Sequence, residues 1–279
     1  MSEKQAELSP SASGKKRRPE SHGFFTFIKR FYLGLVLAFL YLPIVVLIIQ
    51  SFNAGESRAK WEGFSFVWYG KLFTDSNIMN SLWITLSIAA LASLFATVLG
   101  TLAAIGIHAM KKRPQQMMLA LNNIPMTMPD IVTGISLMLL FIFTQVERGY
   151  FTMLLAHITF DVPYVILSIM PKLMQMNKHS YEAALDLGAT PFYALRKVIL
   201  PQIKPGIVTG AMLAFTLSLD DFTISYFTTS PLVQNLSTLI YSQARKGIKP
   251  TMNALSALMF VALLVLLLLV NKRSSEEGN

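Results

Sequence analysis

Apolar residues in this chain come in long blocks that short polar segments separate. Six such blocks lie at about 31–50, 81–108, 117–144, 150–174, 207–228 and 252–271. A helix needs about 20 apolar residues to cross the hydrocarbon core of a bilayer. The pattern therefore predicts an all-α polytopic membrane protein with six transmembrane helices. No soluble domain and no convincing internal repeat is evident.

Composition agrees with a membrane protein and excludes several kinds of chemistry. Of the 279 residues, 53% are hydrophobic and 14% are charged, whereas soluble domains carry roughly 25% charged residues. There is no cysteine, which excludes disulfides and thiolate ligands, and the four His residues are too dispersed to indicate a metal centre. The chain has no GxxxxGK[ST] loop, so we expect no bound ATP, no cofactor and no enzymatic activity.

The basic residues indicate how the chain is oriented. The net charge is +9, but the cations gather between apolar blocks, so we expect no nucleic-acid partner. With a cytoplasmic N-terminus, 17 of the 24 Lys and Arg residues lie in inner segments, as the positive-inside rule requires. Both termini are therefore predicted to be cytoplasmic, with residues 1–22 as a disordered tail. Arg245, Lys246 and Lys249, in the last outer loop, oppose the rule.

Carboxylates inside the predicted spans are the main candidates for function. Asp220 and Asp221 lie near the middle of the fifth span. In the third span, Pro125 and Pro129 are expected to break any helix that continues from the cytoplasmic side, and Asp130 follows immediately. Two central Asp residues oppose insertion by about 5 to 7 kcal/mol, and nine Leu, Ile, Val and Phe residues of the fifth span return only about 3 to 5 kcal/mol. We therefore expect the fifth span to face a polar cavity or partner residues inside a bundle.

The charge of these groups favours a cation as the transported species. None of the six spans carries Lys or Arg away from its ends, and an anion pathway would be expected to use Arg, Lys or helix N-termini. The alternative is that Asp220, Asp221 and Asp130 bond to nearby Ser and Thr and only hold the bundle together. For His157 and Asp161, four residues apart on one helical face, we favour mutual pairing over function.

Small residues recur every four positions in the fifth span and its approach, at Gly206, Gly210, Ala214 and Ser218. Such a stripe lets a neighbouring helix approach closely. Ser218 lies two residues before Asp220 in the same span, and we include it among the candidate residues of a substrate pathway.

The longest predicted inner loop, residues 175–205, has the pattern of two short helices. Ser180 is predicted to cap the first, and Gly188 to end it in a left-handed conformation. Pro191 is suited to the first turn of the second helix, which Pro201 is expected to end. The sequence therefore predicts a compact helix–turn–helix on the inner face of the membrane.

Fixed residues in this loop carry a family resemblance. Glu182-Ala183-Ala184, Gly188 and Val198-Ile199-Leu200-Pro201 reproduce the spacing EAA–x3–G–x9–I–x–L–P, with Val198 in place of Ile. The chain thereby resembles the permeases of binding-protein-dependent ABC importers. The resemblance implies a type I importer permease (MetI-like) fold, in which this loop contacts a separate cytoplasmic ATPase. The ATPase-coupling residues that it implies are Glu182, Ala183, Ala184, Gly188, Leu200 and Pro201. For Glu182, stabilisation of its own helix is an equal alternative.

The resemblance extends over nearly the whole chain and narrows to the spermidine/putrescine permease branch, in particular its second permease subunit. The segments that carry it are MPDIVTGISLMLLF (128–141), AHITF (156–160), EAALDLGA (182–189), FTLSLDDF (215–222) and NALSAL (253–258). It implies a heterodimer with a second permease subunit, two cytoplasmic ATPase subunits, an extracytoplasmic polyamine-binding protein, and a bacterial cell membrane location. The chain departs from the branch at Leu236-Ser237, where a Pro is expected nearby.

A polyamine cargo would give the first outer loop a second interpretation. Trp61, Trp68 and Tyr69 are typical of an interfacial aromatic belt, which we favour. Trp68 is also a candidate pathway residue, because an aromatic ring attracts organic cations.

The sequence leaves other functions open. An importer of another cargo, such as ferric iron or thiamine, fits the same loop. A proton-coupled secondary carrier would use Asp220 and Asp221 as titrating groups, and an intramembrane hydrolase would use Asp130 and Asp221. Uptake that depends on an ATPase separates the importer from the carrier. The residues do not discriminate putrescine from spermidine, since a separate binding protein largely makes that selection.

Overall fold

The computed structural model describes residues 23–57, 60–177, 179–247 and 249–276, which are helical apart from short connections and an isolated β-bridge between Asn53 and Phe64. The predicted tail, residues 1–22, lies outside the described residues. In chain order the helices are α1 (Gly23–Ser51), α2 (Val67–Thr74), α3 (Ser76–Ala109), α4 (Lys112–Thr127), α5 (Asp130–Phe143), α6 (Tyr150–Gln175), α7 (His179–Asp186), α8 (Pro191–Ala194), the π-helix η1 (Leu195–Ile199), α9 (Leu200–Asp220), α10 (Thr223–Thr228), α11 (Leu236–Lys246) and α12 (Pro250–Glu276).

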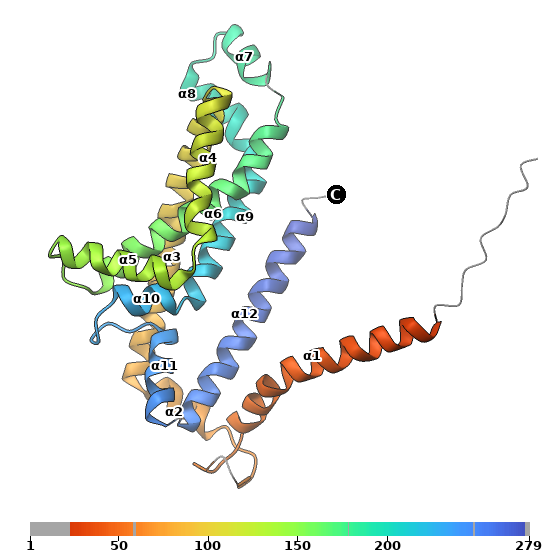
Figure 1. Cartoon of the computed structure of the whole chain (residues 1–279), viewed down its shortest axis with the longest axis vertical. Helices are drawn as coiled ribbons and strands as arrows, with labels where there is room; N and C mark the ends of the chain where they lie inside the picture. Colours follow the sequence, from red (N-terminus) through yellow and green to blue (C-terminus); the bar gives the residue numbers. More distant parts are fainter. Residues whose placement is uncertain (1–22, 58–59, 178, 248, 277–279) are drawn as a thin grey trace, which may run out of the picture. The chain divides into compact units, whose positions relative to one another are not determined.

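The chain divides into two units, residues 1–46 and 47–279. Helix α1 as a whole contains the predicted span 31–50. The described part of the first unit is the larger part of this helix, residues 23–46. The second unit holds α2 to α12 and the packed core. Within it, α7 and α8 lie at one end, and α2 and α11 lie at the other (Figure 1).

Several helices have the length and composition of membrane spans. Among the described residues, four stretches are apolar and long enough to cross a bilayer: Thr26–Ser51, Ser76–Ala109, Tyr150–Gln175 and Pro191–Asp220. The pair α4 and α5 would make a fifth span, and α12 contributes a shorter apolar stretch, Pro250–Val265. The multi-spanning architecture is therefore confirmed, whereas the count of six spans stays a prediction.

The break that the prolines predict in the third span, 117–144, is confirmed, because α4 ends at Thr127 and meets α5 at an angle of 100°. The bend lies at Met128 and Pro129, whose ψ angles of 145° and 134° are extended. Proline lacks a backbone N–H and forces the residue before it out of the helical region. Asp130 then begins α5, which packs against α10 and lies across the direction of α4 (Figure 1).

Helices α3, α6 and α9 pack together and form the centre of the second unit (Figure 1). The predicted small-residue stripe is confirmed, since Gly206, Gly210, Ala214 and Ser218 are all buried. A Cβ atom on Gly206 would lie 3.0 Å from the Ser168 carbonyl oxygen, and one on Gly210 would lie 3.2 Å from the Val165 Cα. The stripe therefore brings the backbone of α9 against α6, as close helix packing in membranes requires.

The prediction that Pro201 ends the second loop helix is wrong. The helix runs from Pro191 through η1 into α9 and ends at Asp220. Pro201 lies in the first turn of α9, just after the π-helical turn in which the Leu200 N–H bonds to the Leu195 carbonyl. A wider π turn accommodates a residue that cannot donate to the usual i−4 carbonyl. The loop is therefore joined rigidly to the span that carries Asp220.

Candidate functional site

The helix of the fifth predicted span, 207–228, breaks at its acidic pair. Helix α9 ends at Asp220 and α10 begins at Thr223, so a continuous helix through this region is a wrong prediction. Asp221 accepts two backbone N–H groups of α10, from Ile224 to Oδ1 at 3.2 Å and from Ser225 to Oδ2 at 2.7 Å. A carboxylate at this position satisfies N–H groups that a new helix leaves open and is favoured by the helix dipole. Asp221 therefore stabilises the break itself.

A chain of hydrogen bonds joins α6 to this break through His157, which is 2% exposed. Ser218 donates to Asp161 Oδ2 at 2.7 Å, and His157 Nδ1 lies 2.9 Å from Ser218 Oγ. Because the Ser218 hydrogen is directed at Asp161, Nδ1 must donate to Ser218. Nε2 of the neutral ring then accepts from Ser225 Oγ at 2.9 Å. Asn235 Nδ2 completes the chain by donating to Ser225 Oγ at 2.8 Å.

These bonds correct the interpretation of His157 and Asp161, which do not pair with each other. Ser218 stands between them, and the His157 Nε2 atom lies 3.5 Å from Asp221 Oδ2. Asp161 is fully buried, and its Oδ1 atom has no hydrogen-bond partner in the described part of the chain. We call His157, Asp161, Ser218, Asp221, Ser225 and Asn235 the break network.

The remaining acidic candidates are exposed. Asp220 and Asp130 both reach the surface of the described chain, Asp220 at the end of α9 and Asp130 in the first turn of α5. By contrast, Ser218 is 2% exposed, so its hydroxyl serves the break network in this structure. Exposed carboxylates at two helix breaks are available to a substrate or to a partner subunit.

Trp68 has partners within the chain. It is 5% exposed, and its Nε1 atom donates to the Asn53 carbonyl at 2.7 Å. The Lys71 ammonium lies 4.5 Å from the centre of its ring. Trp68 thus anchors α2 in an apolar cluster with α11 and α12, and its contact with an organic cation stays a prediction.

The loop 175–205 has the turn that its sequence predicts. Gly188 has a φ of 87°, and its N–H bonds to the Leu185 carbonyl while the Ala189 N–H bonds to the Ala184 carbonyl. This pair of bonds is the Schellman end of a helix, which favours glycine at the left-handed position. The cap at the other end differs from the prediction, because Asn177 and not Ser180 accepts the first N–H group of α7, from His179 at 3.0 Å.

The same loop presents a mixed surface that lies free in this chain. The Glu182 side chain is 71% exposed, with the His179 imidazole 3.4 Å away, and Ala183 is exposed beside it. Leu187 and Phe192 are 89% and 72% exposed, and they were not among the predicted residues. Their apolar character inside a polar loop was the available signal, since exposed apolar patches mark contact surfaces.

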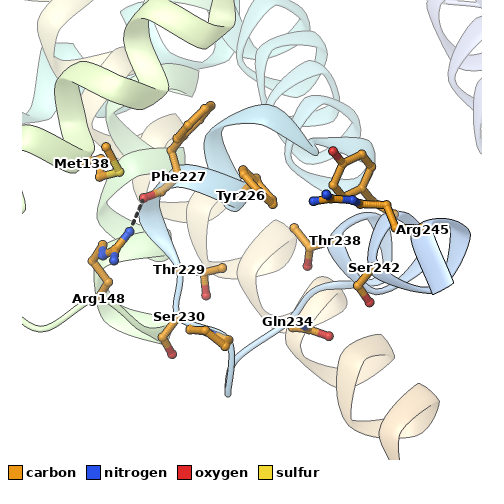
Figure 2. Close-up of a pocket in the computed structure, with 12 residues that line it drawn as sticks. Met138, Arg148, Tyr226, Phe227, Thr229, Ser230, Gln234, Thr238, Ser242 and Arg245 are labelled. Atoms are coloured by element: carbon orange, nitrogen blue, oxygen red, sulfur yellow. Dashed lines mark hydrogen bonds between the residues drawn. The ribbon is translucent and has the colours of Figure 1, made fainter.

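A cavity of about 620 Å³ lies between α5, α10 and α11, and we call it the outer cavity after the side of the membrane that the sequence predicts for its loops. Aromatic and hydroxyl-bearing side chains line it together with two arginines, Arg148 and Arg245 (Figure 2). The Arg148 guanidinium donates to the Phe227 carbonyl at 3.5 Å, and the Arg245 guanidinium lies 5.9 Å from the centre of the Tyr241 ring. Among the residues that the structure describes, no group of three or more His, Asp or Glu side chains is suited to a metal ion.

Comparison with known proteins identifies the relatives of this chain. Residues 96–272 match the family described as "Binding-protein-dependent transport system inner membrane component". The chain is 35% identical over 250 residues to the spermidine/putrescine transport system permease protein PotC of Escherichia coli K12, which covers 89% of this chain and 95% of that protein. It is 39% identical over 237 residues to the putrescine transport system permease protein PotI of the same strain, covering 82% and 84%.

Solved structures share the fold at low sequence identity. A chain of the bacterial ABC transporter that imports the acidic polysaccharide alginate matches with a TM-score of 0.64 and 19% identity, covering 91% of this chain and 99% of that one. A chain of the methionine ABC transporter MetNI, in an inward-facing conformation, matches with a TM-score of 0.59 and 19% identity, covering 72% and 96%.

Proposed function

The chain belongs to the family of binding-protein-dependent transport system inner membrane components, and from this premise we propose that it is a permease subunit of an ATP-driven importer of polyamines. The observation that carries the proposal is its similarity, over 89% of its length, to a spermidine/putrescine permease. The exposed Asp220 and Asp130 support a cationic cargo, because an unpaired carboxylate in a membrane attracts cations.

The coupling loop supports ATP-driven transport. Its exposed residues, Glu182, Leu187 and Phe192, offer a contact surface to a cytoplasmic ATPase subunit. The helix that starts at Pro191 continues to Asp220, so a movement at the loop is transmitted along one rigid element to the break. Ala183 and Ala184 lie in α7, which Gly188 ends, and Leu200 and Pro201 lie within the long helix. The chain itself is a transport subunit, and ATP is hydrolysed on two separate ATPase subunits.

The substrate pathway needs a second permease subunit. One chain presents Asp220 and Asp130 on a surface rather than in an enclosed channel, and a polyamine carries several positive charges. We propose a heterodimer whose partner encloses this surface, with both termini of the present chain in the cytoplasm and the loop 175–205 on the same side. An extracytoplasmic binding protein delivers the polyamine to the opposite face.

Reconstitution tests the proposal. The permease pair and the ATPase are reconstituted in liposomes, with the binding protein on one side of the membrane and ATP on the other. Uptake of radiolabelled spermidine and putrescine is then measured. We expect uptake that needs ATP hydrolysis and all four components, with ferric iron and thiamine as controls that are not transported. Uptake driven by a proton gradient without ATP would show that the chain is a secondary carrier and not an importer subunit. Equal uptake by a homodimer of this chain would refute the heterodimer.

Removal of single charges tests the pathway. Asp220→Asn should reduce uptake by at least about tenfold, because it removes an exposed carboxylate worth about 1.4 kcal/mol or more in the passage of a cation. The substitution keeps the hydrogen bond across the break, since that bond uses the Asp220 backbone carbonyl, which accepts from Ser237 Oγ at 3.3 Å. Wild-type uptake in this variant would remove Asp220 from the pathway.

A further inference from the structure

The outer cavity carries an excess of positive charge at a position where a cationic cargo would be repelled. It is lined by Arg148 and Arg245, and no Asp or Glu is among the residues that line it. Glu147 precedes Arg148 in the chain but does not line the cavity. Both guanidinium groups are exposed, and neither forms an ion pair within the part of the chain that the structure describes. The cavity is therefore an unneutralised cationic site.

The two arginines also contradict the distribution of charge expected for an outer loop. Positive residues are disfavoured on the side of the membrane to which loops are translocated, yet Arg245 belongs to a cluster with Lys246 and Lys249. Contacts inside the chain do not account for Arg245, whose nearest described partner is the Tyr241 ring at 5.9 Å. A partner that is absent from this single chain would account for it.

The geometry of the cavity suits carboxylate groups. In Figure 2 the two arginines lie at opposite sides of the cavity, with Thr229, Thr238 and Gln234 between them, Ser230 on the Arg148 side and Ser242 on the Arg245 side. Guanidinium groups bind carboxylates with two parallel hydrogen bonds, and hydroxyl and amide groups can donate to the remaining oxygens. At about 620 Å³ the cavity accommodates one or two side chains rather than a domain.

The polyamine cargo specifies which partner is acidic. Carboxylates neutralise cationic ligands through charge-assisted hydrogen bonds, so we expect a binding protein for polyamines to carry them around its cleft and to turn that cleft toward the permease during delivery. Resting on the polyamine importer proposed above, we infer that the outer cavity receives acidic side chains from the rim of the binding-protein cleft, and that this contact neutralises Arg148 and Arg245 while the polyamine enters. After the binding protein leaves, the two exposed cations oppose the return of a polycation.

Binding measurements test this inference. The importer is held in nanodiscs, and the dissociation constant of its spermidine-loaded binding protein is measured at several NaCl concentrations. We expect wild-type affinity to fall as salt rises, and the double variant Arg148→Gln/Arg245→Gln to bind at least about tenfold more weakly with a shallower dependence on salt. Arg245→Lys keeps the charge and should recover part of the affinity.

A matched control and a second readout make the result decisive. Lys60→Gln removes an exposed outer cation that does not line the cavity, and it should bind like the wild type. In liposomes preloaded with spermidine, efflux through the double variant should exceed wild-type efflux. The inference is overturned if the wild-type affinity is independent of salt, or if the affinity of the double variant is unchanged. In either case, ATP-driven uptake by the wild type leaves the proposed function standing. Failure of wild-type uptake refutes the proposed function instead.

Discussion

Replacement of Ser218 by alanine isolates the contribution of the break network to stability. Ser218 Oγ bonds to Asp161 Oδ2 at 2.7 Å and to His157 Nδ1 at 2.9 Å, and both partners are at most 2% exposed. The substitution leaves two buried polar atoms unsatisfied, at about 1 to 3 kcal/mol each. Hydrogen bonds between membrane helices have averaged only about 0.6 kcal/mol, because the unfolded chain finds other partners. We expect a loss of about 1.5 to 3 kcal/mol, between these two limits.

Unfolding of the assembled permease in mixed micelles of rising SDS content measures this loss. Ser168→Ala is the matched control, because Ser168 lies on α6 and donates only to the Tyr164 carbonyl of its own helix at 2.9 Å. That carbonyl belongs to the helical ladder, so the control should change stability by no more than about 0.5 kcal/mol. If Ser218→Ala were no less stable than Ser168→Ala, the break network would not hold α6 to α9.

Three further substitutions test the coupling loop, the acidic pair and the helix core. Gly188→Val should abolish substrate-stimulated ATP hydrolysis while membrane insertion persists, because a β-branched residue resists a φ of 87° at a cost of at least about 1 kcal/mol. Gly188→Asn tolerates this conformation and should retain stimulated hydrolysis. Normal hydrolysis in both variants would exclude the loop from coupling. Asp221→Asn keeps one capping oxygen but turns an amide NH2 group toward the second backbone N–H, so thermal stability should fall together with uptake, and unchanged stability would show that Asp221 does not hold the break. Gly100→Val should destabilise the bundle by about 1 to 3 kcal/mol, since its Cβ would lie 2.7 Å from Val165 Cγ1; Gly106→Val on the same helix meets no atom within 4 Å and should be tolerated.

Much of the functional assignment could be predicted from residues that are close in sequence. The left-handed turn at Gly188 and the second loop helix that begins at Pro191 depend on the conformational limits of single residues, and the structure confirms both. The stripe from Gly206 to Ser218 follows from a four-residue period, and it is buried as predicted.

Errors arose where the outcome depended on neighbours that are distant in sequence. The helix continues through Pro201, because a π turn accommodates the missing N–H and α9 packs on α3 and α6. His157 and Asp161 were expected to pair because they lie four residues apart. Ser218 lies 57 residues beyond Asp161 in the chain, and a local pattern contains no information on that contact.

The sequence by itself determined the membrane class, the family and the shape of the coupling loop, because hydrophobic length, fixed spacing and backbone limits act over a few residues. Only the tertiary structure decided that α4 and α5 turn through 100°, that Asp221 caps a new helix, and that Arg148 and Arg245 line one cavity. These features join segments up to about a hundred residues apart, and each depends on which helices pack together. Side-chain partners within a membrane are set by that packing, since no water is present to satisfy polar groups that remain unpaired.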